Sequence, residues 1–482
     1  MRVCLLAEGC YPYVVGGVSS WVQMLIQGMP EHEFIIYAIG AEEKNRGNFK
    51  YTLPPNVVGV KEIFLDSVLN MTTPFRGTIN LSEQEKKVLY DLLLNNKKIE
   101  LSPLSDIFRN RLLKEDFMQI FMSFDFFDII VKVYKEKYSY LAFTDFFWTI
   151  RSLLLPLFYL LQDDIPEADL YHSVASGYCG VIGALVAHYN NKPFIITEHG
   201  IYSREREEEI IKADWVKGDF KSIWIEYFYQ QAYIAYTSAD RVITLFDDNV
   251  KAEIALGCDP KKVSVIPNGV RLENFVNITH EDDPDGDFVI GAIVRVVPIK
   301  DILTMIRAFS LVQQKMPKSK LYIMGPYVED PEYYEECQVL VKSLDLKNVI
   351  FTGSVNIRDY LGKMDLLLLS SISEGQPLAL LEGFAAGLAS VTTDVGCCHQ
   401  VVYGSASDKT DTFGDAGVVV PVMDFEGMAA AVIRLAKNKA LRDKMAQAGR
   451  ERIIKYYGYQ LFIDRYKEVY GYYQNKLNAH LS

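Results

Sequence analysis

The sequence predicts an α/β protein with two domains, each built on a parallel sheet. Short apolar runs alternate with amphipathic helical patterns along most of the chain, and this alternation is typical of β/α units. The chain has 482 residues, which exceeds the size at which a single hydrophobic core stops growing. The polar stretch at 281–287 interrupts the alternation and predicts a linker between the two domains.

Six strands are expected on each side of this linker. In the first domain (residues 1–282) they lie near 2–7, 33–39, 170–172, 193–197, 241–245 and 263–266. In the second domain (residues 288–455) they lie near 288–294, 320–324, 349–351, 366–369, 390–392 and 418–420, with helices near 303–315 and 427–436. The Tyr-rich segment at 456–482 predicts a terminal helix.

The segment at about 66–164 breaks the alternation with helical sequence that is rich in aromatic residues. An insertion of this length is expected to form a helical subdomain of the first domain, with most of its aromatic side chains in a core. It is also the best candidate in the chain for a surface that contacts a partner or an acceptor. Its apolar run at 152–161 is too short to span a bilayer and contains Pro156.

Two carboxylates are the most informative candidates for a site. Glu374 and Glu382 flank seven residues where the buried strand 366–370 gives way to a helix with Pro377 at its first position. In open α/β sheets, ligands bind at the carboxyl ends of strands, beside helix N-termini that attract phosphate. Because Glu382 is expected about two turns into the helix, both carboxylates can face one cleft and accept hydrogen bonds from sugar or ribose hydroxyls. Further candidates for substrate binding are Gly375, Gln376, Pro377 and Leu378.

A second strand-to-helix junction carries two cations. Arg295 ends the run 289–295, and Lys300 precedes the amphipathic segment 301–313. Arginine offers a fork of donors and lysine a point charge, so together they suit a diphosphate whose charge grows as a glycosidic bond breaks. An Arg and a Lys at this spacing are, by themselves, usually solvated surface residues, and the two glutamates alone are as consistent with a helix N-terminal charge and a solvated side chain. The two pairs at the same kind of sheet edge predict a site.

The first domain offers weaker candidates at the ends of its strands. Gly16 and Gly17 follow the first strand, where missing side chains let backbone N–H groups approach a phosphate or a sugar, although a plain turn is the ordinary explanation. His199 ends another strand and is a candidate for contact with sugar or acceptor hydroxyls, whereas the adjacent Glu198 is expected to point away. The case for His172 is weaker. A full G-x-G-x-x-G fingerprint is lacking, which argues against a nicotinamide cofactor.

Composition restricts the class of protein further. A formal net charge of −12 disfavours nucleic acid or an anionic membrane as the main target. Seven cysteines without paired CxxC units predict reduced thiols in a cytoplasmic protein, and no secretory leader is expected at the amino terminus. The string 397–399 (Cys-Cys-His) is interpreted as loop and core. The Asp283-x-Asp285 string invites a metal, but its place in the predicted linker favours a solvated hinge, so no metal is expected.

These motifs together resemble the family 4 retaining glycosyltransferases of GT-B fold, which carry an Arg and a Lys on one loop and an E-x7-E motif on another. The segments 240–245 and 265–270 resemble the family's interdomain segments, and the paired glycines its amino-terminal loop. The resemblance implies two Rossmann-like domains facing across a cleft, and a terminal helix that crosses back to the first. It also implies that Glu382 binds the ribose, Glu374 the sugar, and Arg295 with Lys300 the diphosphate of a UDP-linked sugar, with His199 near the reaction.

The segments 8–21 and 197–202, with the aromatic insertion, resemble transferases of Pel exopolysaccharide synthesis in biofilm-forming bacteria. This narrower resemblance implies a hexose or N-acetylhexosamine donor, a polysaccharide acceptor, and a membrane-bound synthase complex as partner at the inner face of the membrane. Two alternatives remain open at this point. One is a nucleotide-sugar epimerase of GT-B fold, and the other is a non-catalytic scaffold that binds sugar nucleotides.

Overall fold

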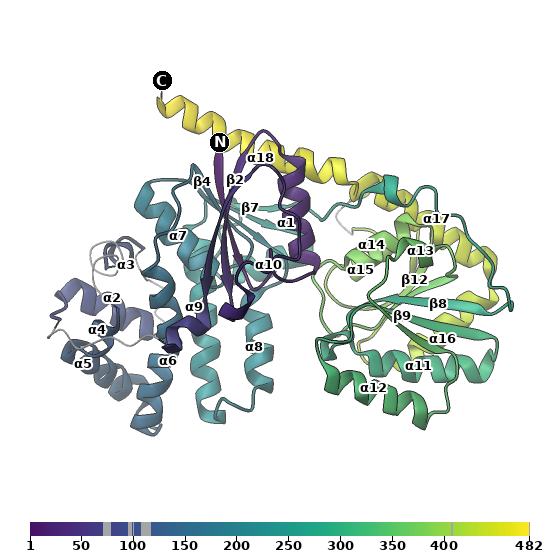
Figure 1. Cartoon of the computed structure of the whole chain (residues 1–482), viewed down its shortest axis with the longest axis horizontal. Coiled ribbons are helices and arrows are strands. Elements are labelled where there is room, and N and C mark those ends of the chain that lie inside the picture. Colours follow the sequence, from purple (N-terminus) through teal and green to yellow (C-terminus); the bar gives the residue numbers. More distant parts are fainter. Residues whose placement is uncertain (71–78, 95–98, 100, 108–116, 406–407, 482) are drawn as a thin grey trace. The chain divides into compact units, whose positions relative to one another are not determined.

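The computed structural model of the protein describes residues 1–70, 79–94, 99, 101–107, 117–405 and 408–481 (Figure 1). The chain divides into two compact units. Unit 1 comprises Met1–Thr244, Asn249–Val265 and Tyr466–Ser482, and unit 2 comprises Leu245–Asp248 and Ile266–Arg465. Parts of the predicted insertion, at 71–78, 95–98, 100 and 108–116, lie outside the described residues.

The division differs from the predicted boundary at 282. Residues 266–282 belong to unit 2 because backbone hydrogen bonds tie them to it: Val270 N donates to Tyr457 O at 2.7 Å, and Glu281 N to Gly362 O at 2.7 Å. The terminal helix α18 (Tyr459–Leu481) contributes its first turns to unit 2 and the remainder to unit 1.

Unit 1 is built on a parallel sheet of seven described strands, in the order β3-β2-β1-β4-β5-β6-β7. The strands are β1 (Arg2–Glu8), β2 (Glu33–Gly40), β3 (Val57–Phe64), β4 (Leu170–Ser173), β5 (Phe194–Glu198), β6 (Arg241–Thr244) and β7 (Val263–Val265). The helices α1 (Gly17–Gly28), α7 (Tyr178–Asn190), α8 (Tyr202–Lys212), α9 (Lys221–Ser238) and α10 (Asp247–Ala255) follow strands of this sheet. Six of these strands match the predicted positions.

The edge strand β3 is missing from the sequence prediction. Only its last two residues, Ile63 and Phe64, are buried, and Gly59 interrupts the apolar pattern. A strand that is half exposed at a sheet edge gains its place from pairing with β2 rather than from its own hydrophobicity.

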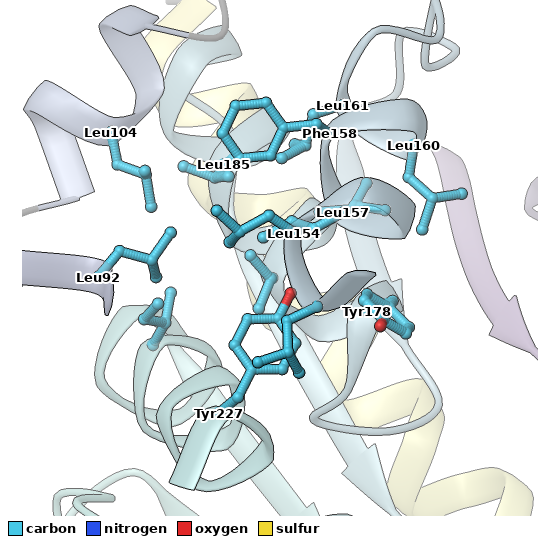
Figure 2. Packing of buried hydrophobic residues seen from close by; sticks show 14 of the residues in the cluster. Leu92, Leu104, Leu154, Leu157, Phe158, Leu160, Leu161, Tyr178, Leu185 and Tyr227 are labelled. Atoms are coloured by element: carbon cyan, nitrogen blue, oxygen red, sulfur yellow. The ribbon is translucent and has the colours of Figure 1, made fainter. Parts of the chain in front are cut away.

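The described part of the insertion between β3 and β4 is mostly helical and shares a core with the helices that follow the strands of unit 1. Its described helices are α2 (Glu83–Leu93), α3 (Leu101–Ile107), α4 (Met118–Phe121), α5 (Phe124–Val133) and α6 (Phe143–Leu161). Figure 2 shows Leu92 of α2, Leu104 of α3 and Leu154 of α6 packed among Leu185 of α7 and Tyr227 of α9. The insertion is therefore held to the domain by a continuous hydrophobic core. Several of its aromatic residues lie at the surface instead, including Phe124, Phe127, Tyr140 and Trp148.

Helix α6 is long and apolar enough to cross a membrane by length and composition. Half of its apolar window is nevertheless buried inside the protein, where Leu154, Leu157 and Phe158 pack in the core of unit 1 (Figure 2). A core helix of a large domain has the same composition, so this helix is weak grounds for a membrane span.

Unit 2 is built on a parallel sheet of six described strands, in the order β10-β9-β8-β11-β12-β13. The strands are β8 (Phe288–Ile293), β9 (Ser319–Met324), β10 (Val349–Gly353), β11 (Leu366–Leu369), β12 (Ala389–Thr393) and β13 (Gly417–Val420). The helices are α11 (Ile302–Lys315), α12 (Pro331–Ser343), α13 (Arg358–Leu361), α14 (Leu378–Ala385), α15 (Cys398–Tyr403), α16 (Phe425–Lys437) and α17 (Lys439–Tyr456). Figure 1 shows α11 and α12 on one side of this sheet and α14 on the other.

The strand order of unit 2 fixes where a ligand site is expected. The chain moves outward from β8 through β9 to β10, then returns to place β11 on the other side of β8. The loops that leave β8 and β11 lead to α11 and α14 on opposite sides of the sheet (Figure 1), and a ligand site is expected at the carboxyl ends of these strands. The β8 loop carries Arg295 and Lys300, and the β11 loop carries Glu374.

Candidate functional site

The loop that leaves β8 ends in a short 3-10 turn, Pro298–Lys300, directly before α11. Asp301 follows in the left-handed region, with φ 45°, and its carboxylate accepts a hydrogen bond from Thr304 N at 3.2 Å. An aspartate tolerates this backbone conformation better than most residues and caps the helix at the same time. Lys300 is thus held just before the first turn of α11.

The loop that leaves β11 is bonded to this turn. Ser370 Oγ donates to Lys300 O at 2.9 Å and to Asp301 O at 3.0 Å. Ile372 N donates to Ile299 O at 2.9 Å. The two loops that were predicted separately therefore form one unit, and side chains on either loop keep a fixed spacing.

Lys300 and Glu374 form an ion pair across these loops. The Lys300 Nζ lies 2.5 Å from Glu374 Oε1, and the two side chains are only 17% and 11% exposed. Ser371 Oγ donates to the same oxygen at 2.6 Å. A pair this sheltered from water is much less screened than a surface pair, so it fixes both side chains.

Glu382 lies on α14, closer to the helix start than predicted. The helix begins at Leu378 with Pro377 as its N-cap rather than at its first position, so Glu382 is the fifth residue and lies just past the first turn. Burial raises the pKa of the Glu382 carboxyl to about 7. Among the described residues, none donates a hydrogen bond to this carboxylate or forms an ion pair with it. A partly buried acid without a donor gains from any hydroxyl that a ligand brings.

Arg295 is paired outside this cluster. Its Nη1 lies 2.5 Å from Glu329 Oε1, and the two side chains are 37% and 48% exposed. An ion pair this open to water contributes little to stability and exchanges readily. Arg295 is therefore available to a stronger anion.

The tip of the β11 loop is held by contacts that sequence reasoning missed. Gln376 is buried and its Oε1 accepts a hydrogen bond from Asn268 N at 2.6 Å. Gly396 has φ +52°, and a Cβ there would lie 2.2 Å from Gly375 O, so only glycine fits. Asn268 lies in the segment 265–270 that was already singled out, whereas nothing near Gly396 in the sequence marks its contact with the loop.

The acidic string of the linker is occupied by a lysine. Lys320 Nζ lies 2.9 Å from Asp283, 3.1 Å from Asp285 and 3.2 Å from Asp287. The ammonium group lowers the pKa of the Asp283 carboxyl through their hydrogen bond. These three carboxylates are close enough together to hold an ion, but Lys320 already supplies the positive charge at their centre.

The three residues of the Cys-Cys-His string at 397–399 differ in burial. Cys397 and Cys398 are buried, whereas the exposed His399 packs edge-on against Tyr403 with ring centroids 4.9 Å apart. Cysteines inside a core and a histidine at the surface do not present their ligand atoms to one ion.

In unit 1, the paired glycines precede a helix at the carboxyl end of β1. Gly16 is the N-cap of α1, with extended backbone that any residue adopts, and Gly17 is its first residue. A Cβ built on either glycine meets no atom of the described residues within 4 Å. Neither backbone strain nor packing therefore requires glycine at these two positions, and the space beside them at the start of α1 is open.

His199 packs against the same helix. Its ring lies edge-on to Trp21 of α1 at 4.7 Å between centroids, and burial lowers the pKa of His199 to about 3. The imidazole is therefore neutral at ordinary pH. Its Nε2 has no hydrogen-bond partner within the described part of the chain. A neutral ring with a free nitrogen is suited to a hydrogen bond with a hydroxyl.

Glu198 and His172, the other two strand-end residues considered with His199, have structural roles. Glu198 is fully buried, and its Oε1 accepts hydrogen bonds from Ser176 Oγ at 2.9 Å and Tyr202 N at 3.0 Å. His172 contacts Tyr470 of α18 through Nδ1 at 2.7 Å, and its Nε2 contacts Thr197 Oγ1 at 2.8 Å. Both ring nitrogens of His172 are thus used within the core.

Taken together, the loops at the carboxyl ends of β8 and β11 and the first part of α14 carry an ammonium group, a guanidinium group and two carboxylates. Cations at this position suit phosphate oxygens, and carboxylates suit hydroxyl groups. The paired glycines and His199 lie at the equivalent edge of the sheet in unit 1.

Comparison with known proteins places both halves of the chain. Residues 1–261 match the family model described as "Domain of unknown function (DUF3492)", and residues 287–438 match the model "Glycosyl transferases group 1". A UDP-Gal:alpha-D-GlcNAc-diphosphoundecaprenol alpha-1,3-galactosyltransferase from Escherichia coli is 25% identical over 332 residues, covering 66% of this chain and 78% of the relative. The capsular polysaccharide biosynthesis glycosyltransferase CapM from Staphylococcus aureus is 22% identical over 308 residues, covering 61% and 74%.

Solved structures extend the likeness of fold over the whole chain. Anabaena Alr3699/HepE, solved in complex with UDP, superposes with a TM-score of 0.62 at 14% identity, covering 98% of this chain and 100% of that one. WaaG, a glycosyltransferase of lipopolysaccharide biosynthesis, superposes with a TM-score of 0.56 at 13% identity, covering 97% and 99%. The predicted GT-B fold with two Rossmann-like domains is confirmed. The chain belongs to the family described as "Domain of unknown function (DUF3492)", and its carboxyl-terminal domain is a glycosyltransferase domain of group 1.

Proposed function

We propose that the protein is a retaining, metal-independent glycosyltransferase that takes its sugar from a UDP-linked hexose or N-acetylhexosamine. The observation that carries this proposal is the set of charged side chains at the carboxyl ends of β8 and β11 and at the start of α14. There the Lys300–Glu374 ion pair lies on the loops after β8 and β11, where the strand order reverses. Glu382 lies on the adjoining helix α14, and its carboxylate has no hydrogen-bond donor among the described residues.

Each of these charged side chains has a proposed role. Arg295 and Lys300 bind the diphosphate and stabilise the negative charge that develops as it leaves. Glu382 accepts hydrogen bonds from the ribose hydroxyls, and Glu374 from the hydroxyls of the transferred sugar. The backbone from Gly375 to Leu378 approaches the phosphates at the start of α14, where free N–H groups favour an anion.

The Lys300–Glu374 pair gives this assignment a specific form. Lys300 faces a carboxylate on one side, so an incoming phosphate completes its environment rather than replacing its partner. Glu374 is in turn held by Lys300 and Ser371, which leaves the sugar as the variable contact. Turnover therefore depends on both members of the pair, whereas binding of free nucleotide depends more on Glu382.

In the proposed reaction, the bond between the anomeric carbon and the diphosphate oxygen breaks. The acceptor oxygen forms its new bond on the same face of the sugar, and the acceptor proton passes to an oxygen of the departing phosphate. Gly16, Gly17 and His199 of unit 1 form the proposed acceptor side, where the neutral His199 exchanges a hydrogen bond with a sugar hydroxyl and does not act as a nucleophile.

For the acceptor, we propose a growing exopolysaccharide of the Pel type, the role of the transferase PelF. The names of the E. coli and S. aureus relatives, which concern a UDP-Gal donor and capsular polysaccharide, support a nucleotide sugar and a glycan. HepE was solved with UDP, which supports the choice of base. A cytoplasmic location and a membrane-bound synthase complex as partner belong to the same proposal.

A panel of nucleotide sugars tests this function. The purified protein is incubated with each donor in EDTA, with and without oligosaccharide acceptors, and the released nucleoside diphosphate is measured. We expect release that depends on the acceptor, with a UDP-linked hexose or N-acetylhexosamine as the best donor. Formation of an epimer from the donor alone would indicate an isomerase. Binding of nucleotide sugars without any turnover would indicate a scaffold.

A further inference from the structure

The pairing of Arg295 is not explained by the proposed reaction. Its Nη1 contacts Glu329 Oε1 at 2.5 Å, although Arg295 is needed for the diphosphate. Glu329 lies on the loop between β9 and α12, next to the loop that carries Arg295. A carboxylate in this place competes directly with a phosphate for the same guanidinium group.

The main chain holds the two loops together beyond the ends of their strands. Val294 N donates to Met324 O at 2.9 Å, and Val296 N donates to Pro326 O at 2.9 Å. Arg295 lies between these two bonds. Its side chain therefore starts from a fixed point beside the β9 loop, and the contact with Glu329 does not depend on a chance position of a long side chain.

The loop between β9 and α12 is also held at its α12 end. Asp330, which follows Glu329, caps α12 by accepting a hydrogen bond from Tyr333 N at 3.0 Å. Tyr327 stacks on Tyr334 of α12 with ring centroids 4.4 Å apart. Glu329 is held between an aromatic stack and a helix cap, so the backbone aims it at the arginine while its side chain stays half exposed.

We propose that Glu329 sets the affinity of the donor site for nucleotide: it holds Arg295 while the site is empty, yields it to the diphosphate, and takes it back as the product leaves. This inference rests on the proposed function, and in particular on the role of Arg295. Because the pair is open to water, the diphosphate displaces Glu329 at small cost, and Glu329 is solvated again once displaced. Glu329 then competes with the bound nucleoside diphosphate for Arg295, and this competition shortens the stay of the product.

The expected effect follows from the exposure of the pair. Exposed ion pairs shift an equilibrium by roughly two- to fivefold, so Glu329→Gln is expected to bind UDP tighter by about that factor. Most of the change is expected in a slower dissociation of UDP, because interactions made at a bound ligand act mainly on its off-rate. If product release limits turnover, kcat falls while KM falls with it.

Calorimetric titration with UDP and displacement kinetics on four proteins test the inference: wild type, Glu329→Gln, Arg295→Ala and the double variant. Glu329→Gln is expected to bind tighter and release UDP more slowly, and to have no such effect when Arg295 is absent. Glu332→Gln is the matched control, because Glu332 is exposed in the first turn of α12 and its substitution removes the same charge nearby.

The outcomes separate this inference from the proposed function. If wild-type protein binds UDP and Arg295→Ala weakens it, but Glu329→Gln binds as the wild type or as Glu332→Gln does, the role of Glu329 is wrong and the donor site stands. An equal gain in affinity with and without Arg295 would also overturn it, since the effect would then be general charge. No binding of UDP or a UDP-sugar by the wild type would overturn the proposed function and this inference with it.

Discussion

The substitution Glu382→Gln is expected to weaken nucleotide binding while leaving the empty protein as stable or more stable. Burial raises the pKa of this carboxyl to about 7, and within the described part of the chain no donor offsets the cost of its charge. Glutamine has the same shape but no charge to desolvate. The substitution therefore removes a desolvation penalty from the folded protein and removes a charged hydrogen-bond acceptor for the ligand.

The size of the loss follows from the kind of bond. A hydrogen bond to a carboxylate contributes about 1–3 kcal/mol, which corresponds to roughly 5- to 150-fold in affinity at 25 °C. Because the ribose belongs to the nucleotide, the same loss is expected for free UDP and for a UDP-sugar. Glu374→Gln is expected to leave the affinity for free UDP nearly unchanged and to reduce turnover and discrimination among sugars.

The pH dependence gives a second reading of the same substitution. The carboxylate accepts hydroxyl donors better than the neutral acid does, so wild-type affinity for a UDP-sugar should rise as the pH increases through about 7. A UDP-sugar is the proper probe because its diphosphate does not titrate in this range. The affinity of Glu382→Gln should be flat over the same range.

Calorimetry of both glutamate variants with UDP and a UDP-sugar at pH 6 and pH 8, beside thermal melts of the empty proteins, decides the matter. Equal losses of free-UDP affinity in Glu374→Gln and Glu382→Gln would refute the division of roles. A strong destabilisation of empty Glu382→Gln would show that this carboxylate serves the fold.

Three further predictions concern catalysis, metal and stability. Arg295→Ala and Lys300→Ala are each expected to lower turnover by roughly a hundredfold, since a cation that meets developing charge contributes about 3 kcal/mol, and near-wild-type kinetics in both folded variants would contradict their role. Activity should survive EDTA, and Asp285→Asn should be active, because Lys320 already contacts each carboxylate of that cluster with its positive charge; loss of turnover in both experiments would show a required metal. Burial raises the pKa of the Glu198 carboxyl from an ordinary 4.5 to about 8, so the folded protein holds this proton more tightly than the unfolded chain does. The stability that comes from this difference is fully present below pH 4.5 and is lost as the pH rises toward 8. Glu198→Gln should therefore gain stability over the wild type in urea melts at pH 8 compared with pH 5, and an unchanged difference would refute the shifted pKa.

Much of the architecture could be predicted because its signals are local. Mostly buried strands such as β8 and β11 appear as continuous apolar runs, and the amphipathic pattern after Lys300 indicates α11. The loops that bear the cations and the carboxylates follow directly from these elements. Strand β3 escaped prediction because its position comes from its neighbour β2, which no pattern within β3 encodes.

The partners of the site residues could not be predicted, because they lie far away in the sequence. Lys300 meets Glu374 over 74 positions, and Arg295 meets Glu329 over 34. Lys320, which fills the acidic string of the linker, is an ordinary strand residue by sequence. Charge and spacing thus identify which side chains can act, whereas the fold decides which of them are already paired.

A crystal structure of the protein with UDP tests the proposed donor site most directly. The site requires the diphosphate within hydrogen-bond distance of Lys300 and Arg295, the ribose hydroxyls on the carboxylate of Glu382, and Glu329 turned away from Arg295. A nucleotide bound elsewhere, or one that leaves Glu382 without a partner, would contradict it.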